Sequence, residues 1–201
     1  MEILQFFGNT VNQRYIDQAA DALRSGQLVI YPTDTHYAIG CDPSNRQAVQ
    51  ALVKFKGGEK TKDTFTLICG DISQASSLAR IDNVTFRILK NNTPAPITFL
   101  LNPAPHLLKN LKGRQTVGLR IPDQPVTVEL AKALGSPILS ASLSLDSETA
   151  SNPDAIALAI PQAAAYILDA GTSPAQSSTI LDLTDPADPT LLRQGPVDPI
   201  L

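Results

Sequence analysis

The sequence of 201 residues is poor in the residues that form metal sites and covalent cross-links. It contains two cysteines, Cys41 and Cys69, and two histidines, His36 and His106, without a C-x-x-C or H-x-x-x-H pair. This pattern argues against a structural zinc site and a disulfide framework, and favours a reducing cytosol. Both cysteines end apolar runs, so we expect buried, unreactive thiols. No G-x-S-x-G motif accompanies the histidines, which we expect in loops or on the surface rather than as catalytic bases.

The chain also lacks long hydrophobic segments. No stretch approaches the roughly 18 apolar residues that a membrane span requires, and the first residues show no cationic region followed by an apolar one. We therefore expect neither a standard secretion signal nor a membrane anchor, and a cytoplasmic location. Aromatic residues form only 5% of the chain, which argues against a platform that stacks the bases of single strands.

Helical and strand patterns alternate along the chain. Helical spacing covers residues 16–23, 48–55, 84–90 and 126–134, with Gly26 and Gly135 as stop signals, Ser44 in an N-cap position and Pro125 at a helix start. An apolar run covers residues 3–7, and strand-like segments cover residues 28–31, 66–69, 97–101, 116–120, 138–140, 166–168, 179–182 and 191–193. The alternation predicts one α/β domain over residues 1–201, built on one sheet, and the Pro- and Asp-rich C-terminal segment forms a flap or edge extension.

Charge is distributed unevenly, although the net charge is only −3. Residues 46–120 hold 12 cations and 4 acids, a local charge of +8, whereas residues 1–45 carry −3 and residues 121–201 carry −8. A cationic middle is suited to a phosphate or RNA face. Lysines and arginines that only solvate exposed helix faces explain the same count, and the sequence leaves both interpretations open.

Four lysines crowd the end of the second helical pattern and the glycine loop after it: Lys54, Lys56, Lys60 and Lys62. Helix C-termini favour cations, which gives Lys54 and Lys56 a structural reason. Loop lysines beside a flexible glycine backbone are suited to holding a polyphosphate. The loop is not a P-loop, because G-x-x-x-x-G-K-[ST] is absent, and no G-x-G-x-x-G follows a strand.

Short motifs in a fixed order distinguish this chain from a generic α/β protein. Tyr31–Tyr37, YPTDTHY, describes by itself only a proline-initiated turn. It is followed by Pro94–Thr98, Thr116–Pro122, Ser140–Ser142, Ser177–Thr179 and Leu192–Gly195. In this order the sequence resembles the YrdC family of threonylcarbamoyl-AMP synthases. Three segments resemble its YciO-type branch: Phe65–Leu67, Asn91–Pro94 and Ser140–Leu143.

The resemblance implies a twisted, mixed sheet flanked by helices, with a concave basic cavity. Members of the family join L-threonine, bicarbonate and ATP into threonylcarbamoyl-adenylate and pyrophosphate, a step toward threonylcarbamoyl-adenosine in tRNA. The family is also described as binding double-stranded RNA. The resemblance thus implies ATP as a substrate with Mg²⁺ as its counter-ion, no structural metal, and tRNA or tRNA-modification proteins as partners.

Carried onto this sequence, the resemblance assigns Lys56 and Arg120 to catalysis, by positioning and charge neutralisation rather than by a covalent nucleophile. Arg120 is expected to pair with the carboxylate of threonine. The predicted threonine-binding residues are Thr35, Arg120, Ser140, Ser178 and Thr179. The predicted nucleotide-binding residues are Lys54, Lys56, Lys60, Thr116, Ser142 and Arg193, with Lys62 as a further phosphate contact. Taken singly, the hydroxyl groups of Thr35, Ser140 and Ser178 are better explained as satisfied turn or strand-edge groups. A structural carboxylate is an alternative partner for Arg120.

The chain departs from the family pattern at three places. Lys56–Glu59 reads KGGE in place of Lys-Gly-Arg-Pro, Ser142–Ser144 reads SLS in place of Ser-x-Asn, and Ala38 replaces a glycine. Loss of one charge-assisted contact costs about 1.5 to 3 kcal/mol, so we expect a weakened synthase. Two alternatives stay open: a non-catalytic module that binds double-stranded RNA or tRNA through a basic concave surface, and a ligand-sensing regulator.

Overall fold

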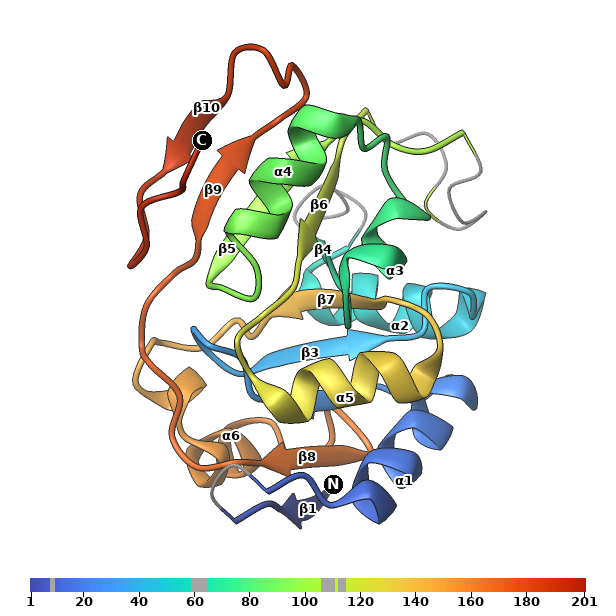
Figure 1. The fold of residues 1–201 in the computed structure, drawn as a ribbon. Coiled ribbons are helices and arrows are strands. Elements are labelled where there is room, and N and C mark those ends of the chain that lie inside the picture. The colour runs from blue at the N-terminus through green and yellow to red at the C-terminus, as the bar shows by residue number, and fades with distance from the viewer. Residues whose placement is uncertain (8–9, 59–64, 106–110, 112–114) are drawn as a thin grey trace.

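Ten strands of the chain form one sheet in the order β1-β8-β2-β3-β7-β4-β6-β5-β9-β10 (Figure 1). The structure is a computed structural model that describes residues 1–7, 10–58, 65–105, 111 and 115–201. The strands are β1 (Glu2–Gln5), β2 (Val29–Tyr31), β3 (Ala38–Cys41), β4 (Thr66–Ile68), β5 (Ile97–Leu101), β6 (Val117–Arg120), β7 (Ile138–Ser142), β8 (Tyr166–Asp169), β9 (Thr179–Asp182) and β10 (Thr190–Arg193). The sheet is mixed: it contains parallel pairs, such as β4 with β6, and antiparallel pairs, such as β3 with β7. The predicted α/β fold with a mixed sheet flanked by helices is confirmed.

Helices connect most of the strands. They are α1 (Gln13–Arg24), α2 (Arg46–Lys56), α3 (Ile72–Ser76), α4 (Asn83–Asn91), α5 (Pro125–Leu134) and α6 (Pro153–Ala159), with a 3₁₀ turn, η3, at Thr149–Ser151. As predicted, helix α5 begins at Pro125 and stops before Gly135, its C-cap, which adopts a left-handed conformation with φ of 76°. The predicted N-cap Ser44 is wrong by one residue. The side chain of Asn45 accepts hydrogen bonds from the backbone N–H groups of residues 47 and 48 and caps α2.

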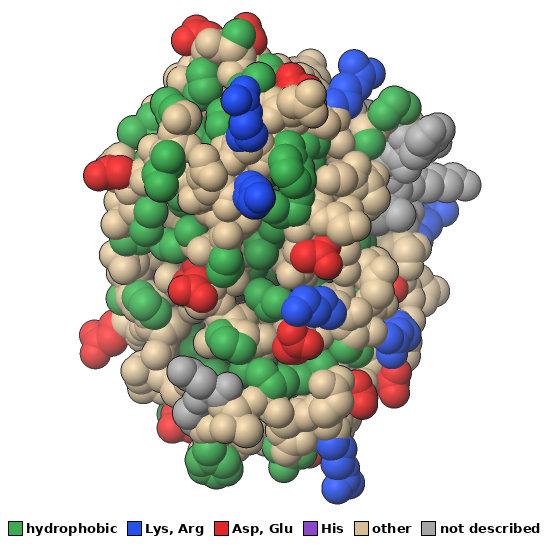
Figure 2. All heavy atoms as spheres, in the orientation of Figure 1, with side chains coloured by type: hydrophobic (Ala, Val, Ile, Leu, Met, Phe, Trp, Pro, Cys, Tyr) green, Lys and Arg blue, Asp and Glu red, His purple; other side chains and the backbone are tan. Residues whose placement is uncertain are grey.

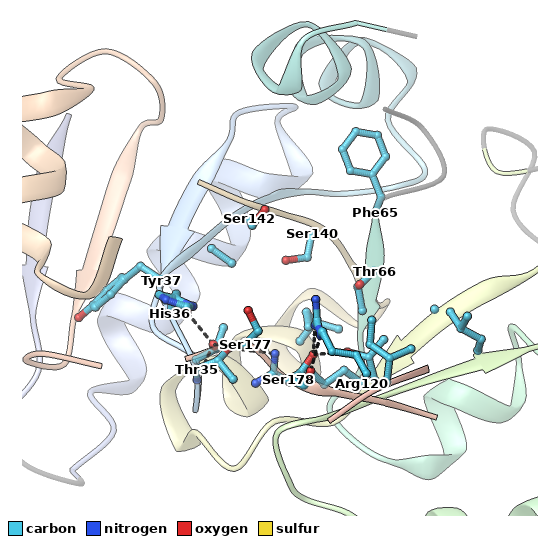
Figure 3. Close-up of a pocket in the computed structure, with 18 of the residues that line it drawn as sticks. Thr35, His36, Tyr37, Phe65, Thr66, Arg120, Ser140, Ser142, Ser177 and Ser178 are labelled. Carbon is cyan, nitrogen blue, oxygen red and sulfur yellow. Dashed lines mark hydrogen bonds between the residues drawn. The ribbon is translucent and has the colours of Figure 1, made fainter. Parts of the chain in front are cut away.

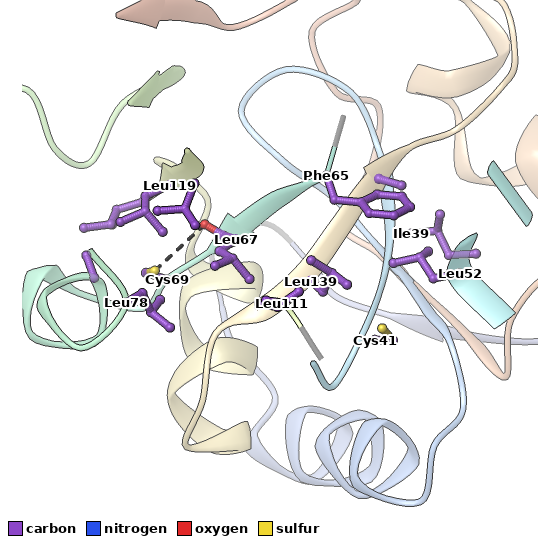
Figure 4. Close-up of a cluster of buried hydrophobic side chains, with 14 of the residues drawn as sticks. Ile39, Cys41, Leu52, Phe65, Leu67, Cys69, Leu78, Leu111, Leu119 and Leu139 are labelled. Carbon is purple, nitrogen blue, oxygen red and sulfur yellow. Dashed lines mark hydrogen bonds between the residues drawn. The ribbon is translucent and has the colours of Figure 1, made fainter. Parts of the chain in front are cut away.

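The two faces of the sheet are covered differently. Because side chains alternate along a strand, the cross-strand register places Leu67, Leu119 and Leu139 on one face. This face packs against α2, α3, α4 and α6 in the larger hydrophobic cluster (Figure 4). Both cysteines are buried on this side, and burial raises the pKa of each thiol to about 12, in agreement with the expectation of unreactive thiols.

The opposite face is covered only in part. Helices α1 and α5, which pack against each other, cover the half of the sheet near β1, β8, β2 and β3 through a second hydrophobic cluster (Figure 1). Toward β7, β4, β6, β5 and β9 the same face carries small polar side chains and is hollowed into a cavity. The site is therefore the part of this sheet face that α1 and α5 leave uncovered.

The C-terminal segment extends the edge of the sheet. Strand β10 pairs antiparallel with β9 and includes the predicted segment 191–193, so the edge-extension interpretation is confirmed. Two helices were not predicted, α3 and α6, which are only five and seven residues long. Among the described residues, no helix combines the length and the apolar character needed to cross a membrane.

Candidate functional site

The cavity on the uncovered sheet face has a volume of about 520 Å³. Figure 3 shows its wall of short polar side chains around the guanidinium of Arg120. The described lining residues are Thr33, Thr35, His36, Tyr37, Ala38, Phe65, Thr66, Ile68, Thr98, Leu100, Thr116, Gly118, Arg120, Ser140, Ser142, Ser177, Ser178, Ile180 and Arg193. Nine of these residues are serine or threonine, two are arginine, and none is aspartate or glutamate. A lining of hydroxyl groups and arginines without a carboxylate suits a ligand rich in anionic oxygens.

Strand register explains why these residues meet. Thr66 on β4 pairs with Gly118 on β6 and with Ser140 on β7, so the three lie in one row across the sheet. Residues two positions away, such as Arg120 and Ser142, fall on the same face because the side-chain period of a strand is two. Gly118 contributes no side chain, and a Cβ there would approach Thr66 Oγ1 to 3.6 Å. Gly118 therefore keeps the floor of the cavity low.

Arg120 forms the most buried charged contact of the site. Arg120 is only 7% exposed, and its guanidinium forms an ion pair with the carboxylate of Asp34, whose side chain is 10% exposed. A second guanidinium nitrogen donates to Thr35 Oγ1 at 3.0 Å, and Nε has no hydrogen-bond partner. Burial lowers the pKa of Arg120 from its ordinary value, and the neighbouring Asp34 opposes this shift. The structural carboxylate that the sequence left open is therefore present.

The turn after β2 is held by its own threonines. Thr33 Oγ1 donates to the carbonyl of His36 at 2.6 Å and accepts from the backbone N–H of Thr35 at 3.1 Å. Its proton is thereby used, so Thr35 must be the donor in the 2.9 Å contact between the two hydroxyls. Since Arg120 also donates to Thr35, the hydroxyl of Thr35 offers the cavity only a lone pair.

Two serines on β7 receive donors from outside the cavity. The hydroxyl of Tyr31 donates to Ser140 Oγ at 2.6 Å. Lys56, half-buried at the end of α2, donates from Nζ to Ser142 Oγ at 2.8 Å and to the carbonyl of Ser142 at 3.0 Å. Burial lowers the pKa of Lys56 from its ordinary value. Both serines thus accept a hydrogen bond and keep their own proton for a ligand.

The opposite wall of the cavity is formed by β9 and β10. Arg193 donates from Nε to the carbonyl of Ser178 at 2.8 Å and from a terminal nitrogen to Ser178 Oγ at 3.0 Å. The hydroxyl of Ser178 also lies 3.0 Å from that of Thr98 on β5. No carboxylate pairs with Arg193 in the part of the chain that the structure describes. Its charge is therefore available to a ligand.

The structure brings together most of the residues predicted from the sequence. Those that line the cavity are Thr35, Thr116, Arg120, Ser140, Ser142, Ser178 and Arg193. Lys56 contacts the cavity through Ser142. Lys54 is exposed and absent from the lining, and the hydroxyl of Thr179 donates to the carbonyl of Val197 instead. Lys60, Lys62 and His106 lie outside the described residues.

Sequence reasoning missed several lining residues, among them Thr33, Thr66, Thr98 and Ser177. The place of Thr66 opposite Ser140 follows from the strand register, which no local pattern in the sequence indicates. His36, expected in a loop or on the surface, lies in a loop but lines the cavity, and its Nε2 is buried without a partner. Burial, and secondarily Arg120, lower its pKa from the ordinary value.

The described surface does not show a continuous basic patch on the face drawn in Figure 2. Lysine and arginine side chains lie apart there, separated by acidic, apolar and other side chains. Within the described ranges, no group of three or more His, Cys, Asp and Glu residues is arranged to hold a metal ion. Because Arg120 is paired with Asp34, the remaining positive charge at the site comes from Arg193 and the adjacent Lys56.

Comparisons with known proteins agree with this geometry. The family model of Sua5, YciO and YrdC, described as "Telomere recombination", matches residues 21–195. The protein YciO of Escherichia coli is 36% identical over 187 residues, covering 91% of this chain and 90% of its own. Its crystal structure superimposes with a TM-score of 0.86 over 98% of both chains, at 33% identity.

Two further relatives carry functional names. A threonylcarbamoyl-AMP synthase of Methylococcus capsulatus is 34% identical over 129 residues, covering 63% of this chain and 69% of its own. The crystal structure of P. abyssi Sua5 complexed with L-threonine matches with a TM-score of 0.83 and 25% identity, over 97% of this chain and 58% of that longer one. By family model, sequence and structure, this chain belongs to the Sua5/YciO/YrdC family.

Proposed function

We propose that the cavity binds L-threonine and ATP, and that the protein forms threonylcarbamoyl-adenylate from them with bicarbonate. The observation that carries this proposal is the lining itself, with nine hydroxyl side chains, two arginines and no carboxylate among its described residues. The relatives add support, since one is named a threonylcarbamoyl-AMP synthase and another was crystallised with L-threonine.

The proposed chemistry has two bond-forming steps. The amine of threonine, after losing a proton, attacks the carbon of bicarbonate and gives a carbamate, with release of water; with CO₂ as the acceptor, a second proton leaves the nitrogen instead of water. A carbamate oxygen then attacks the α-phosphorus of ATP, and pyrophosphate leaves. Both steps bring anionic oxygens together, so a catalyst must mainly position the reactants and neutralise charge. Mg²⁺ enters with ATP as part of the substrate.

Residues of this chain fit distinct tasks in that reaction. Arg193, whose charge no described carboxylate cancels, is suited to the phosphates of ATP, and Thr116 lies in the same cavity. Lys56 and the Ser142 hydroxyl that it contacts present a further pair of donors. Thr35, Ser140 and Ser178 supply hydroxyls for threonine. Arg120 organises Thr35 and Asp34, and we assign it a supporting role beside the threonine site.

The departures from the family pattern fit a slow or redirected synthase. Gly58 stands where the family carries arginine, and Ser144 stands where it carries asparagine. Loss of one such contact in the transition state lowers the rate by about one to two decades. We therefore expect measurable product at a reduced rate.

The test is to incubate the full chain with ATP, L-threonine and bicarbonate and to measure pyrophosphate and the adenylate. We expect product from the wild type and at least about tenfold less from Lys56→Ala, which loses the charged donor on Ser142. Lys90→Ala, which removes an exposed lysine of α4, is the matched control. Absence of product together with absence of ATP binding by calorimetry would overturn the proposal.

Binding of duplex RNA is the alternative that the sequence leaves open, and it stays a prediction. It would be supported by an affinity for duplex RNA that falls steeply with salt, because cations on the protein release counterions from the phosphates. A flat salt response would contradict a contact through a basic face.

A further inference from the structure

A buried tyrosine stands directly behind the wall of the cavity. Tyr31 on β2 is fully buried in the cluster formed with α1 and α5 and does not line the cavity. Its hydroxyl nevertheless donates to Ser140 Oγ on β7 at 2.6 Å. This distance is shorter than the 2.8 Å between Lys56 Nζ and the hydroxyl of Ser142 on the same strand. Figure 3 shows Ser140 among the side chains that surround the cavity.

The contact depends on a missing side chain in the strand between them. Strand β3 separates β2 from β7, and Gly40 of β3 pairs with Ser140. A Cβ at Gly40 would lie 2.8 Å from the Tyr31 hydroxyl and 2.9 Å from the carbonyl oxygen of Leu139. Because Gly40 has no side chain, the phenol of Tyr31 can pass over β3 and reach Ser140 on β7.

The direction of this hydrogen bond decides what Ser140 offers a ligand. Tyr31 is the donor in this hydrogen bond, and burial, which raises the pKa of Tyr31 above its ordinary value, keeps the phenol protonated. Ser140 accepts, and its own O–H stays available toward the cavity. Thr35 has the opposite arrangement, because its proton goes to Thr33 and it keeps only a lone pair.

We propose that Tyr31 is a positioning residue that holds the hydroxyl of Ser140 as a hydrogen-bond donor to an anionic oxygen of the bound amino acid. The inference rests on the proposed function, because it takes L-threonine as the ligand and its carboxylate as the acceptor. A fixed donor bonds a charged carboxylate oxygen more strongly than the neutral carbonyl oxygen of a carboxamide, and it cannot bond the amide NH₂ group at all. The cavity would therefore select for the acid form of its ligand partly through a residue that never touches it.

The experiment is a double-mutant cycle read by calorimetry with two probes, L-threonine and its carboxamide, L-threoninamide. Tyr31→Phe keeps the buried ring and removes only the hydroxyl, and Ser140→Ala removes its acceptor. We expect Tyr31→Phe to lower the affinity for L-threonine by about two- to tenfold, which corresponds to the loss of one hydrogen bond. In the Ser140→Ala background the same change should have no further effect. Tyr15→Phe, which alters a half-buried tyrosine of α1 outside the cavity, is the matched control.

The carboxamide gives the readout that a purely structural role would not change. In Tyr31→Phe the serine hydroxyl turns freely between donor and acceptor, so the preference for L-threonine over its carboxamide should fall by a factor similar to the loss in affinity. Ser140→Ala should lower this preference by itself, which keeps the proposal testable should Tyr31→Phe unfold.

Two outcomes would overturn the inference, and they differ in what else they overturn. Equal losses from Tyr31→Phe with and without Ser140, at an unchanged preference between the probes, would show that Tyr31 acts only through the fold, and the proposed function would stand. A wild-type protein that binds neither L-threonine nor ATP would contradict the proposed function and this inference together.

Discussion

Two arginines face the same cavity from opposite walls, and their surroundings differ. Arg120, at the end of β6, is 7% exposed and is matched by the carboxylate of Asp34 and the hydroxyl of Thr35. Arg193, on the edge strand β10, is exposed and bonded only to neutral oxygen atoms of Ser178 among the described contacts. At the wall that contains Arg120, the Arg120 wall, the positive charge is neutralised by Asp34. At the wall that contains Arg193, the Arg193 wall, the positive charge is not neutralised by a described carboxylate.

This difference separates residues that build the cavity from residues that act in it. A buried guanidinium whose charge is already matched contributes mainly to the shape of the turn after β2, because removal of either partner leaves an uncompensated charge. An arginine held by neutral acceptors keeps an uncancelled charge at a fixed place, which suits phosphate oxygens. Substitution of Arg120 should therefore affect mainly stability, and substitution of Arg193 mainly ligand affinity.

The largest expected effect is on stability at the Arg120 wall. Arg120→Ala leaves the carboxylate of Asp34 buried without its partner and should lower the free energy of unfolding by about 3 to 5 kcal/mol, measured by urea denaturation. The double variant Arg120→Met with Asp34→Asn removes both charges and should recover a large part of that loss. A loss below about 1 kcal/mol in Arg120→Ala, the range of an exposed ion pair, would contradict a structural role for this pair.

The next effect is on affinity at the Arg193 wall. Arg193→Ala should lower the affinity for ATP by about tenfold to a hundredfold, since it removes charge-assisted contacts. The melting temperature should change little, because the side chain is exposed. Calorimetry and thermal melting of the same samples separate the two quantities. Arg87→Ala on the exposed side of α4 is the control, and Arg193→Lys should lie between wild type and alanine. Equal ATP affinity in wild type and Arg193→Ala would contradict a contact between Arg193 and ATP, and Arg193 would then have only a structural role.

Local signals explain which parts of the fold were predictable. Helix α5 has a proline at its start, a glycine at its end and an apolar stripe between them, and its bounds follow from the sequence to within one residue. Helices α3 and α6 are too short for a periodic pattern, so they were missed. Ser44 and Asn45 are both good N-cap residues, and only the folded backbone decides between them.

The site was predictable as a set of residues but not as a network. Most of the residues that the motifs assigned to the site line the cavity, because the order of the motifs reflects the family. Nothing local indicates that Arg120 meets Asp34, 86 positions away, or that Tyr31 reaches Ser140, 109 positions away. Such pairs depend on strand order and register, which residues distant in the chain decide together. The roles of Lys54 and Thr179 illustrate the converse, since a motif position does not guarantee a place in the lining.

The smallest expected effect is the pH dependence of stability, which should arise at the Arg120 wall. His36 lies there, and burial, with Arg120 second, lowers its pKa below the ordinary value of 6.5. Below pH 6.5 the unfolded chain binds this proton more readily than the folded one, so stability should fall as the pH drops through 6.5 toward the lower folded pKa. His36→Gln should lose less stability than wild type between pH 7 and 5.5 in urea denaturation. Between pH 7.5 and 8.5, where His36 is neutral in both states, the two proteins should change in parallel. Equal losses of stability in wild type and His36→Gln below pH 6.5 would contradict a role of His36 in this pH dependence.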